Sequence, residues 1–371
     1  MALTIEEQIK AIQEEIDKTQ KNKATEYHIG KLKAKMAKLR EDVEKRRASS
    51  GGGGKGYSVK KSGNATIALV GFPSVGKSTL LNTLTGAGSA VGAYDFTTLD
   101  VVPGAYEYEG AKIQVLDMPG LIRDASKGKG RGREVLSVVH SSDLILFVLD
   151  FYDTNLQVLV RELENAGMRI NTHAPDVVIY RREIGGVDVK ATVKLTKLDL
   201  EIARAMVMEY GLVNAEVVIR EDVNMDQLID VLAGNRIYLN AVLAINKIDI
   251  SDEAYLKEIR IKFKDWDPVF ISAFKNIGID ELKAKIFKKL ELVRIYMKKQ
   301  GQDADLDEPF IVKNGSTVGD VCDSMHRVFR QNFRYALVWG KSARFPGQMV
   351  GLEHRLADGD VLSVIIKRTG E

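Results

Sequence analysis

The sequence has a single cysteine, Cys322, in 371 residues. One thiol excludes a framework of intrachain disulfides and fits a reducing compartment, so we expect a cytoplasmic protein. No apolar run approaches the roughly 18 residues that a membrane-spanning helix requires. The polar first residues also lack the apolar core of a signal peptide. A disulfide-rich secreted protein and an integral membrane protein are therefore not expected.

The composition is that of a globular protein, with 45% hydrophobic and 28% charged residues, and the length allows two or three domains. The net charge of +3 is too small to indicate a nucleic-acid partner by itself. The charge is unevenly distributed, because residues 1–61 contain 15 Lys and Arg against 9 Asp and Glu. The rest of the chain is slightly acidic.

The N-terminal residues 1–48 are predicted to form a helical hairpin. Apolar side chains recur at helical spacing in residues 4–22 and 27–47, and the break is expected at residues 27–30. Two interpretations are open: the hairpin packs on the body of the protein, or its basic residues contact RNA. The glycine-rich residues 49–64 are predicted to be a flexible linker.

An α/β domain is expected over residues 65–300. Short apolar runs at 66–71, 112–117, 144–150 and 241–246 are typical of buried parallel strands separated by helices. The long gap between the last two predicts a small inserted α+β subdomain over about 170–238, with a hairpin at 176–192, a helix at 198–211 and a strand at 215–221. Residues 282–299 are predicted to be a closing helix. Residues 301–371 should form a separate mixed-β domain, with strands near 310, 335 and 361 and a helix near 317–329.

The segment GFPSVGKS, residues 71–78, follows an apolar strand and precedes the helical sequence TLLNTL. In that context the pattern predicts a phosphate-binding P-loop, because glycines let backbone N–H groups surround a phosphate. Lys77 is expected to bind the β- and γ-phosphates, and Ser78 is expected to bind Mg²⁺. The motif indicates a nucleoside triphosphate without specifying the base. The expected binding residues here are Gly71, Ser74, Val75, Gly76, Lys77, Ser78 and Thr79.

The segment NKID, residues 246–249, ends an apolar strand at the edge where open α/β sheets bind ligands. The Asp249 carboxylate can accept hydrogen bonds from N1–H and the 2-amino group of guanine together. Adenine lacks these donors, so ATP would leave that carboxylate unpaired. Lys247 would lay its alkyl stem over the base, and Asn246 would brace the loop. The expected base site is completed by a strand in VFISAF, residues 269–274, which ends in Ser272 and Ala273 and is followed by Phe274. The backbone at its end could meet the guanine oxygen.

Two further segments predict the γ-phosphate and metal contacts. In DMPGL, residues 117–121, Asp117 is expected to contact Mg²⁺ through water, and the Gly120 N–H to contact the γ-phosphate. In DFTTLD, residues 95–100, Thr98 is preferred over Thr97 as the hydroxyl that turns to Mg²⁺. The predicted metal site is therefore Ser78, Thr98 and Asp117, and the predicted catalytic residues are Lys77, Thr98 and Gly120.

These motifs, with SAF at 272–274 and in this order, resemble those of the Obg-related GTPases. The helical N-terminus, EIGGVDV, AGNRIYLNAVLAINKID and PFIVKNGSTVGDVCDSMHRVF narrow the resemblance to the developmentally regulated GTP-binding protein family, over essentially the whole chain. The resemblance implies a P-loop GTPase domain, an insert similar to a ribosomal-protein fold, and a C-terminal β-grasp domain of the TGS type. It also implies association with ribosomes or RNA in translation and, for eukaryotic members, dedicated protein partners.

The activation of the attacking water is the gap in this prediction. Leu121 occupies the position where many hydrolases of this type carry a catalytic glutamine, and its side chain cannot hydrogen-bond water. Intrinsic hydrolysis is therefore expected to be slow and to need a group from elsewhere. K⁺ is one source of charge, although related potassium-stimulated GTPases have Asn at the position of Ser74. Lys129, Arg131 and Arg133 are another source.

The expected function is that of a Mg²⁺-dependent GTPase, a nucleotide switch in ribosome- or RNA-associated translation control. The alternative is a non-enzymatic RNA-binding or ribosome-assembly protein in which GTP is structural. An ATP-driven protein would conflict with Asp249. The basic N-terminus and the C-terminal domain are the candidate RNA contacts, which would make binding steeply salt-dependent. No sequence feature indicates a membrane partner or DNA specificity, and a protein partner could not be identified from the chain.

Overall fold

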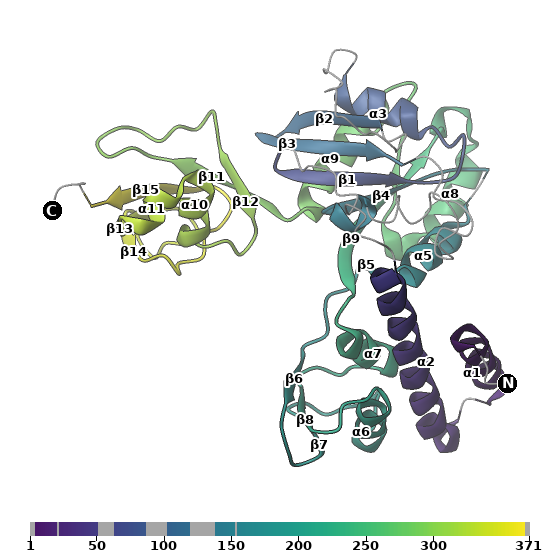
Figure 1. The fold of residues 1–371 in the computed structure, drawn as a ribbon. Coiled ribbons are helices and arrows are strands. Elements are labelled where there is room, and N and C mark those ends of the chain that lie inside the picture. The colour runs from purple at the N-terminus through teal and green to yellow at the C-terminus, as the bar shows by residue number, and fades with distance from the viewer. Residues whose placement is uncertain are drawn as a thin grey trace. The chain divides into compact units, whose positions relative to one another are not determined.

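The computed structural model describes residues 4–20, 22–50, 63–86, 102–118, 138–152 and 154–367. The chain divides into two compact units, which are described separately (Figure 1). Unit 1 consists of Met1–Gly56 and Gly167–Tyr238, and unit 2 consists of Tyr57–Ala166 and Leu239–Glu371. Among the described helices, none is both long and apolar enough to span a membrane.

A mostly parallel sheet forms the centre of unit 2, with the order β10-β9-β4-β1-β3-β2. The neighbours from β10 to β3 are parallel, and the edge strand β2 is antiparallel to β3. A short seventh strand, β5 Met168–Ile170, pairs with β9. Every residue of β1 and β4 is buried, as expected for strands with both faces covered. The four strands predicted from apolar runs are confirmed, whereas β2 was not predicted. The bounds are β1 Ala65–Val70, β2 Val102–Tyr108, β3 Ala111–Asp117, β4 Leu144–Asp150, β9 Ile237–Asn246 and β10 Val269–Phe270.

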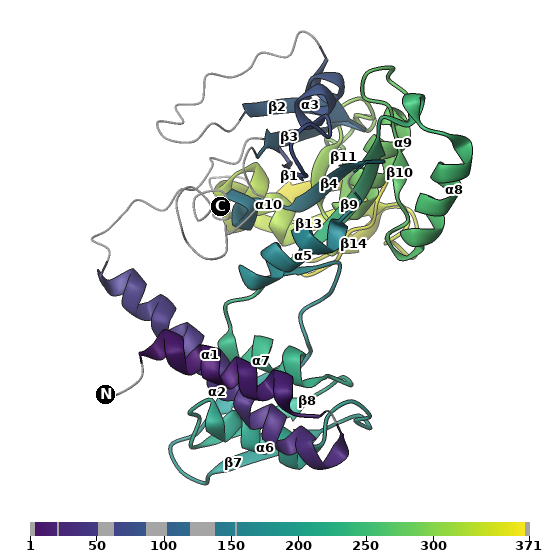
Figure 2. The same ribbon diagram turned by 90° about the vertical axis from the view of Figure 1, so that its right-hand side faces the viewer.

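Helices cover this sheet (Figure 2). On one face, Leu80 and Leu84 of α3 and Leu282 and Ile286 of α9 pack in one core with strand residues such as Ile67. On β4, Phe147 meets the ring of Trp266 edge-on, with 5.7 Å between the ring centroids. The helices of this domain are α3 Lys77–Thr85, α5 Leu156–Asn165, η1 Ile248–Ile250, α8 Glu253–Lys262, η2 Lys264–Trp266 and α9 Ile279–Lys289.

The insert in unit 1 is an α+β subdomain, as predicted, but its strand pairing differs from the prediction. Its three-stranded sheet has the order β6-β8-β7, so β6 and β7 do not form the hairpin predicted at 176–192. The last strand in sequence lies between them because Ala215, Val217 and Ile219 of β8 are fully buried in the core. The bounds are β5 Met168–Ile170, β6 Val177–Arg181, β7 Val187–Ala191, α6 Leu200–Glu209, β8 Ala215–Ile219 and α7 Met225–Ala233.

The N-terminal helices are α1 Ile5–Lys18 and α2 Lys23–Ser50. The break predicted at residues 27–30 is wrong, because α2 runs through them. Helix α1 ends at Lys18 and α2 begins at Lys23, and here the Thr19 hydroxyl donates to the Glu15 carbonyl and the Asn22 side chain accepts from the Thr25 N–H. Gly30 instead allows close helix packing, since a Cβ there would lie 2.9 Å from Ile202 Cγ2 of α6.

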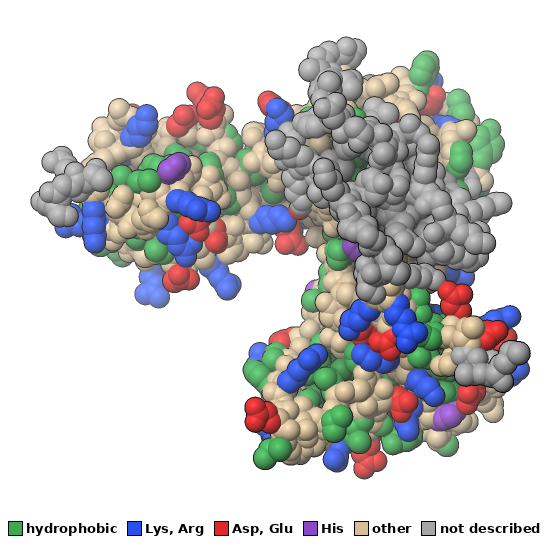
Figure 3. Space-filling model, viewed as in Figure 1, with side chains coloured by type: hydrophobic (Ala, Val, Ile, Leu, Met, Phe, Trp, Pro, Cys, Tyr) green, Lys and Arg blue, Asp and Glu red, His purple; other side chains and the backbone are tan. Residues whose placement is uncertain are grey.

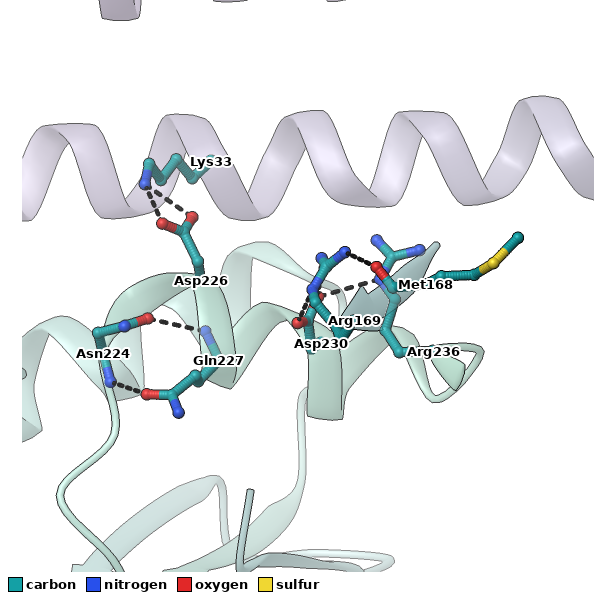
Figure 4. A network of polar contacts seen from close by, with 8 residues as sticks. All are labelled: Lys33, Met168, Arg169, Asn224, Asp226, Gln227, Asp230 and Arg236. Atoms are coloured by element: carbon teal, nitrogen blue, oxygen red, sulfur yellow. Dashed lines mark hydrogen bonds and ion pairs between the residues drawn. The ribbon is translucent and has the colours of Figure 1, made fainter. Parts of the chain in front are cut away.

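Helix α2 is part of the core of the insert. Ala34 is fully buried in the same cluster as the side chains of α6 and β8. Lys33 Nζ lies 2.7 Å from Asp226 Oδ1 on α7 (Figure 4), and the Tyr210 hydroxyl donates to Glu41. Of the two interpretations of the N-terminus, the structure therefore supports packing on the body of the protein for α2.

A buried ionic network fixes α7 within unit 1 (Figure 4). Both carboxylate oxygens of Asp230 accept from the Arg169 guanidinium at 2.5 Å, and Arg236 Nε lies 3.0 Å from Oδ1. A buried carboxylate needs such partners, because an unpaired charge away from water is costly. The same helix begins with a reciprocal capping box between Asn224 and Gln227.

The C-terminal domain has a five-stranded sheet of order β12-β11-β15-β13-β14 with helices α10 and α11. The strands predicted near 310, 335 and 361 and the helix near 317 are confirmed. The closing helix predicted over 282–299 is wrong beyond residue 290, since Leu292–Met297 form β11 of this sheet, before the predicted boundary at 300. The alternating burial of Val293 and Ile295 is the pattern of a strand. The bounds are β11 Leu292–Met297, β12 Phe310–Lys313, α10 Val318–Met325, α11 Arg327–Gln331, β13 Phe333–Trp339, β14 Gln348–Val350 and β15 Asp360–Ile366.

Candidate functional site

The loop between β1 and α3 has the backbone that the P-loop motif predicts. A Cβ at Gly71 would lie 2.2 Å from the Val148 carbonyl oxygen, so only glycine fits there. Gly76 has φ +92°, and a Cβ there would lie 2.5 Å from Asn246 Nδ2. Helix α3 starts at Lys77 with no side-chain cap. The first-turn N–H groups and the helix dipole therefore form a site for an anion.

The side chain of Lys77 is held by backbone carbonyl groups of the phosphate loop. Its Nζ donates to the carbonyl oxygens of Gly71 at 3.1 Å and Phe72 at 3.0 Å. Burial lowers the pKa of Lys77, while the negative charge of Asp117 acts in the opposite direction. A partly desolvated ammonium is a strong partner for phosphate, because its electrostatic attraction is less screened than in water.

Ser78 and Asp117 meet beside the P-loop. Ser78 Oγ donates to Asp117 Oδ2 at 2.7 Å, and the Asp117 residue is only 5% exposed. The other oxygen, Asp117 Oδ1, is buried and has no hydrogen-bond partner in the described part of the chain. A hydroxyl beside a buried carboxylate with a free oxygen matches the oxygen ligands that Mg²⁺ prefers in phosphate sites. These two residues therefore fit the predicted metal site.

The other predicted residues of this region are outside the described residues. They include the catalytic candidates Thr98 and Gly120, as well as Thr97 and Leu121. The basic candidates for charge stabilisation, Lys129, Arg131 and Arg133, also belong to this group. Their predicted roles remain predictions.

Asn246 links the phosphate loop to the predicted base loop. Its Nδ2 donates to the Val75 carbonyl oxygen at 2.9 Å, and its Oδ1 accepts from the Ala273 N–H at 3.0 Å. Thr83 of α3 adds a second connection, because its hydroxyl donates to the Ala273 carbonyl oxygen at 2.8 Å. The bracing role predicted for Asn246 thus has a geometric basis. Thr83 was missed, since nothing in its local sequence distinguishes it from other helix residues.

A pocket of about 260 Å³ opens beside these contacts. The Asp249 side chain is 11% exposed. A hydrogen bond from Ser272 and the nearby charge of Lys275 lower the pKa of Asp249, so its carboxylate is ionised at neutral pH. Phe274, in contrast, is 85% exposed at the rim. The structure therefore brings the two predicted base loops together with the helix start. The pocket is lined by Gly76, Thr79, Asn246, Lys247, Asp249, Ile250, Ser272, Ala273 and Phe274.

Known proteins share this organisation. Residues 66–182 match the family described as 50S ribosome-binding GTPase, residues 184–292 match its C-terminal region, and residues 293–366 match the TGS domain. An uncharacterized GTP-binding protein of Methanocaldococcus jannaschii is 56% identical over 367 residues, covering 98% of this chain and 93% of that protein. Developmentally-regulated G-protein 2 of Arabidopsis thaliana is 44% identical over 372 residues, covering 99% and 92%. The chain belongs to the developmentally regulated GTP-binding protein family.

The chain is thus a GTP-binding protein with an α/β P-loop GTPase domain and a C-terminal TGS domain. A solved GTP-binding protein from Pyrococcus horikoshii is 16% identical to this member of the developmentally regulated family, with a TM-score of 0.47, covering 81% of this chain and 100% of that one. One polar residue in contact with the predicted base-site residue Lys247 was missed from the sequence. Asp150 ends β4, and its Oδ2 lies 2.8 Å from Lys247 Nζ. The available signal was an aspartate at the end of the apolar run LILFVLD.

Proposed function

We propose that this GTP-binding protein hydrolyses GTP to GDP and phosphate with Mg²⁺ at a slow intrinsic rate, as a nucleotide switch in ribosome- or RNA-associated translation control. The observation that carries the proposal is the Ser78–Asp117 pair beside Lys77, with one buried Asp117 oxygen left free. A hydroxyl and a buried carboxylate beside a lysine suit a Mg²⁺-bound triphosphate, which is the form in which phosphoryl transfer takes place. The match to a family described as ribosome-binding supports the choice of partner.

The chain's own groups would bind and orient the triphosphate. The first-turn N–H groups of α3 would hold the β-phosphate, and Lys77 would exchange its loop carbonyls for phosphate oxygens. Ser78 and Asp117 would hold Mg²⁺, which when bound neutralises charge between the β- and γ-phosphates. Thr98 is proposed to add its hydroxyl to the Mg²⁺ site, and the Gly120 N–H is proposed to contact the γ-phosphate.

The base would lie in the pocket beside Asn246. Asp249 would accept from guanine, and the Lys247 stem would cover one face of the ring. Ser272 and Ala273 would border the guanine oxygen, with Phe274 at the rim. Asp249 is ionised without the base, so its oxygens are acceptors only, which suits guanine and not adenine.

We propose that a group other than the Leu121 side chain activates the attacking water. Ser74 lies at φ +64° in the phosphate loop, and its hydroxyl would be one ligand of a K⁺ ion beside the phosphates. A basic residue of the segment 129–133 or a group from the ribosome would serve the same purpose. Each source predicts a different requirement for turnover.

The test is GTP turnover by the full chain in K⁺ and in Na⁺ buffers, with and without ribosomes. Stimulation by K⁺ alone would assign the missing charge to a cation, and stimulation by ribosomes would assign it to the partner. If neither increases turnover above that of a Lys77→Ala variant, the hydrolase proposal is wrong. The chain would then be a binding protein that uses GTP structurally.

A further inference from the structure

Asp150 lies next to the base-binding segment although it is distant in sequence. It is the last residue of β4, and it is paired in register with Asn246, the last residue of β9. The two parallel strands therefore end together, and Asp150 is beside the residue that precedes Lys247. The Asp150 residue is only 5% exposed.

The contacts of Asp150 fix the position of one lysine. Its Oδ2 lies 2.8 Å from Lys247 Nζ, and its Oδ1 accepts from the Tyr152 N–H at 3.1 Å. Lys247 has φ +67°, a left-handed conformation that non-glycine residues adopt rarely. Its carbonyl oxygen accepts from the Ile250 N–H at 3.2 Å. The ammonium group and the backbone of Lys247 are thus both held in place without a ligand.

We propose that Asp150 is a positioning residue for the nucleotide base and that it acts through Lys247. A free lysine stem samples many rotamers, and ordering it would reduce the binding free energy. The ion pair orders the stem in advance, so the apolar part of Lys247 is a preformed surface for one face of the base. The inference rests on the proposed contact between Lys247 and the base.

The preformed surface predicts a specific pattern of affinities. The Lys247 stem would contact the face of the ring, which guanine and hypoxanthine share. The loss of affinity on removing this contact should therefore be the same with and without the 2-amino group. Asp150→Asn keeps the shape and the acceptor for Tyr152 but removes the charge. We expect this variant to bind GDP and inosine diphosphate each about tenfold more weakly, because the rotamer freedom of the Lys247 stem must then be lost on binding.

The experiment measures the Kd for both nucleotides in Asp150→Asn, Lys247→Ala and the double variant of the full chain. If Asp150 acts through Lys247, the double variant binds no more weakly than Lys247→Ala. A purely structural role would instead make the two losses multiply. Asp143→Asn is the matched control, because Asp143 is an acidic residue at the opposite end of β4 that accepts from the Thr66 N–H at 3.0 Å. It should leave both affinities unchanged.

Each outcome has a separate meaning. If Lys247→Ala binds GDP like the wild type, the proposed base contact itself is wrong. If Lys247→Ala is weaker while Asp150→Asn is unchanged, or if the losses multiply, only the role of Asp150 is overturned. Should Asp150→Asn fail to fold, Lys247→Met removes the charge but keeps an unbranched stem. If the ion pair is responsible, Lys247→Met should show the same tenfold loss of affinity. An unchanged Kd would refute the role of the ion pair.

Discussion

Replacing Asn246 by alanine should destabilise the GTPase domain even without nucleotide. The Asn246 residue is 3% exposed, and its side chain bridges two buried residues, through the Val75 carbonyl oxygen and the Ala273 N–H. Truncation leaves both backbone groups unpaired, and each costs about 1–3 kcal/mol when water cannot replace the partner. Taking the middle of that range twice, we expect a loss of about 4 kcal/mol in the free energy of unfolding.

The assay is urea unfolding followed by the fluorescence of Trp266. The chain has two tryptophans, so a Trp339→Phe background leaves Trp266 as the only reporter. Its ring contacts Phe147 of the central sheet and therefore reports on the GTPase domain. Circular dichroism as a second probe checks that the transition is two-state, because multidomain chains often unfold in steps.

Asn240→Ala is the matched control on the same strand. Its side chain makes one hydrogen bond, from Nδ2 to the Lys289 carbonyl oxygen at 3.0 Å, in a partly buried position. The expected loss is about 1 kcal/mol, the net value of an ordinary hydrogen bond. If Asn246→Ala costs no more than this control, the interpretation of Asn246 as the brace between the two loops is refuted.

Three further substitutions test other parts of the structure. Asp117→Asn should raise the Mg²⁺ concentration needed for GTP binding by about tenfold, since it removes the buried charge, and titration of Mg²⁺ against a fluorescent GTP analogue measures this. Asp249→Asn should weaken GTP without weakening ATP, as competition binding would show. Gly30→Val should destabilise unit 1 by about 1–3 kcal/mol through overpacking against Ile202. Faster hydrogen exchange in α2 and α6 would show it, whereas unchanged exchange would contradict the packing.

The nucleotide-binding part of the fold was predictable because its signals are local. A P-loop combines a buried strand, glycines with defined backbone needs and a helix start within a few residues, and the run from Ala65 to Thr85 contains all of these. The NKID segment likewise ends a strand that is buried on both faces. Asp150 also ends an apolar run, but its contact with Lys247 could not be predicted from that run, since it depends on β4 and β9 ending side by side.

The errors arose where non-local packing decides the outcome. The hairpin predicted at 176–192 had the expected glycine turn, yet β8 takes the central position because its apolar face fills the core. Residues 27–30 were predicted to be a helix break, although Gly30 lies within α2 and provides room for α6. The closing helix predicted over 282–299 ends early, because pairing with β15 and β12 makes Leu292–Met297 a strand. Each error concerns a partner segment distant in the sequence.

The basic residues of the N-terminal segment were one reason to expect RNA binding, but several of them form ion pairs within unit 1. Lys31 and Lys33 pair with Glu209 and Asp226 of the insert. Farther along α2, Lys38 lies 3.6 Å from Glu41. Figure 3 shows basic and acidic side chains intermixed over the visible face of unit 1. Charges that are already paired release fewer counterions when RNA binds, so the excess of Lys and Arg overstates the salt dependence that α2 can produce. The basic sequence is therefore explained at least in part by the docking of α2 on the insert.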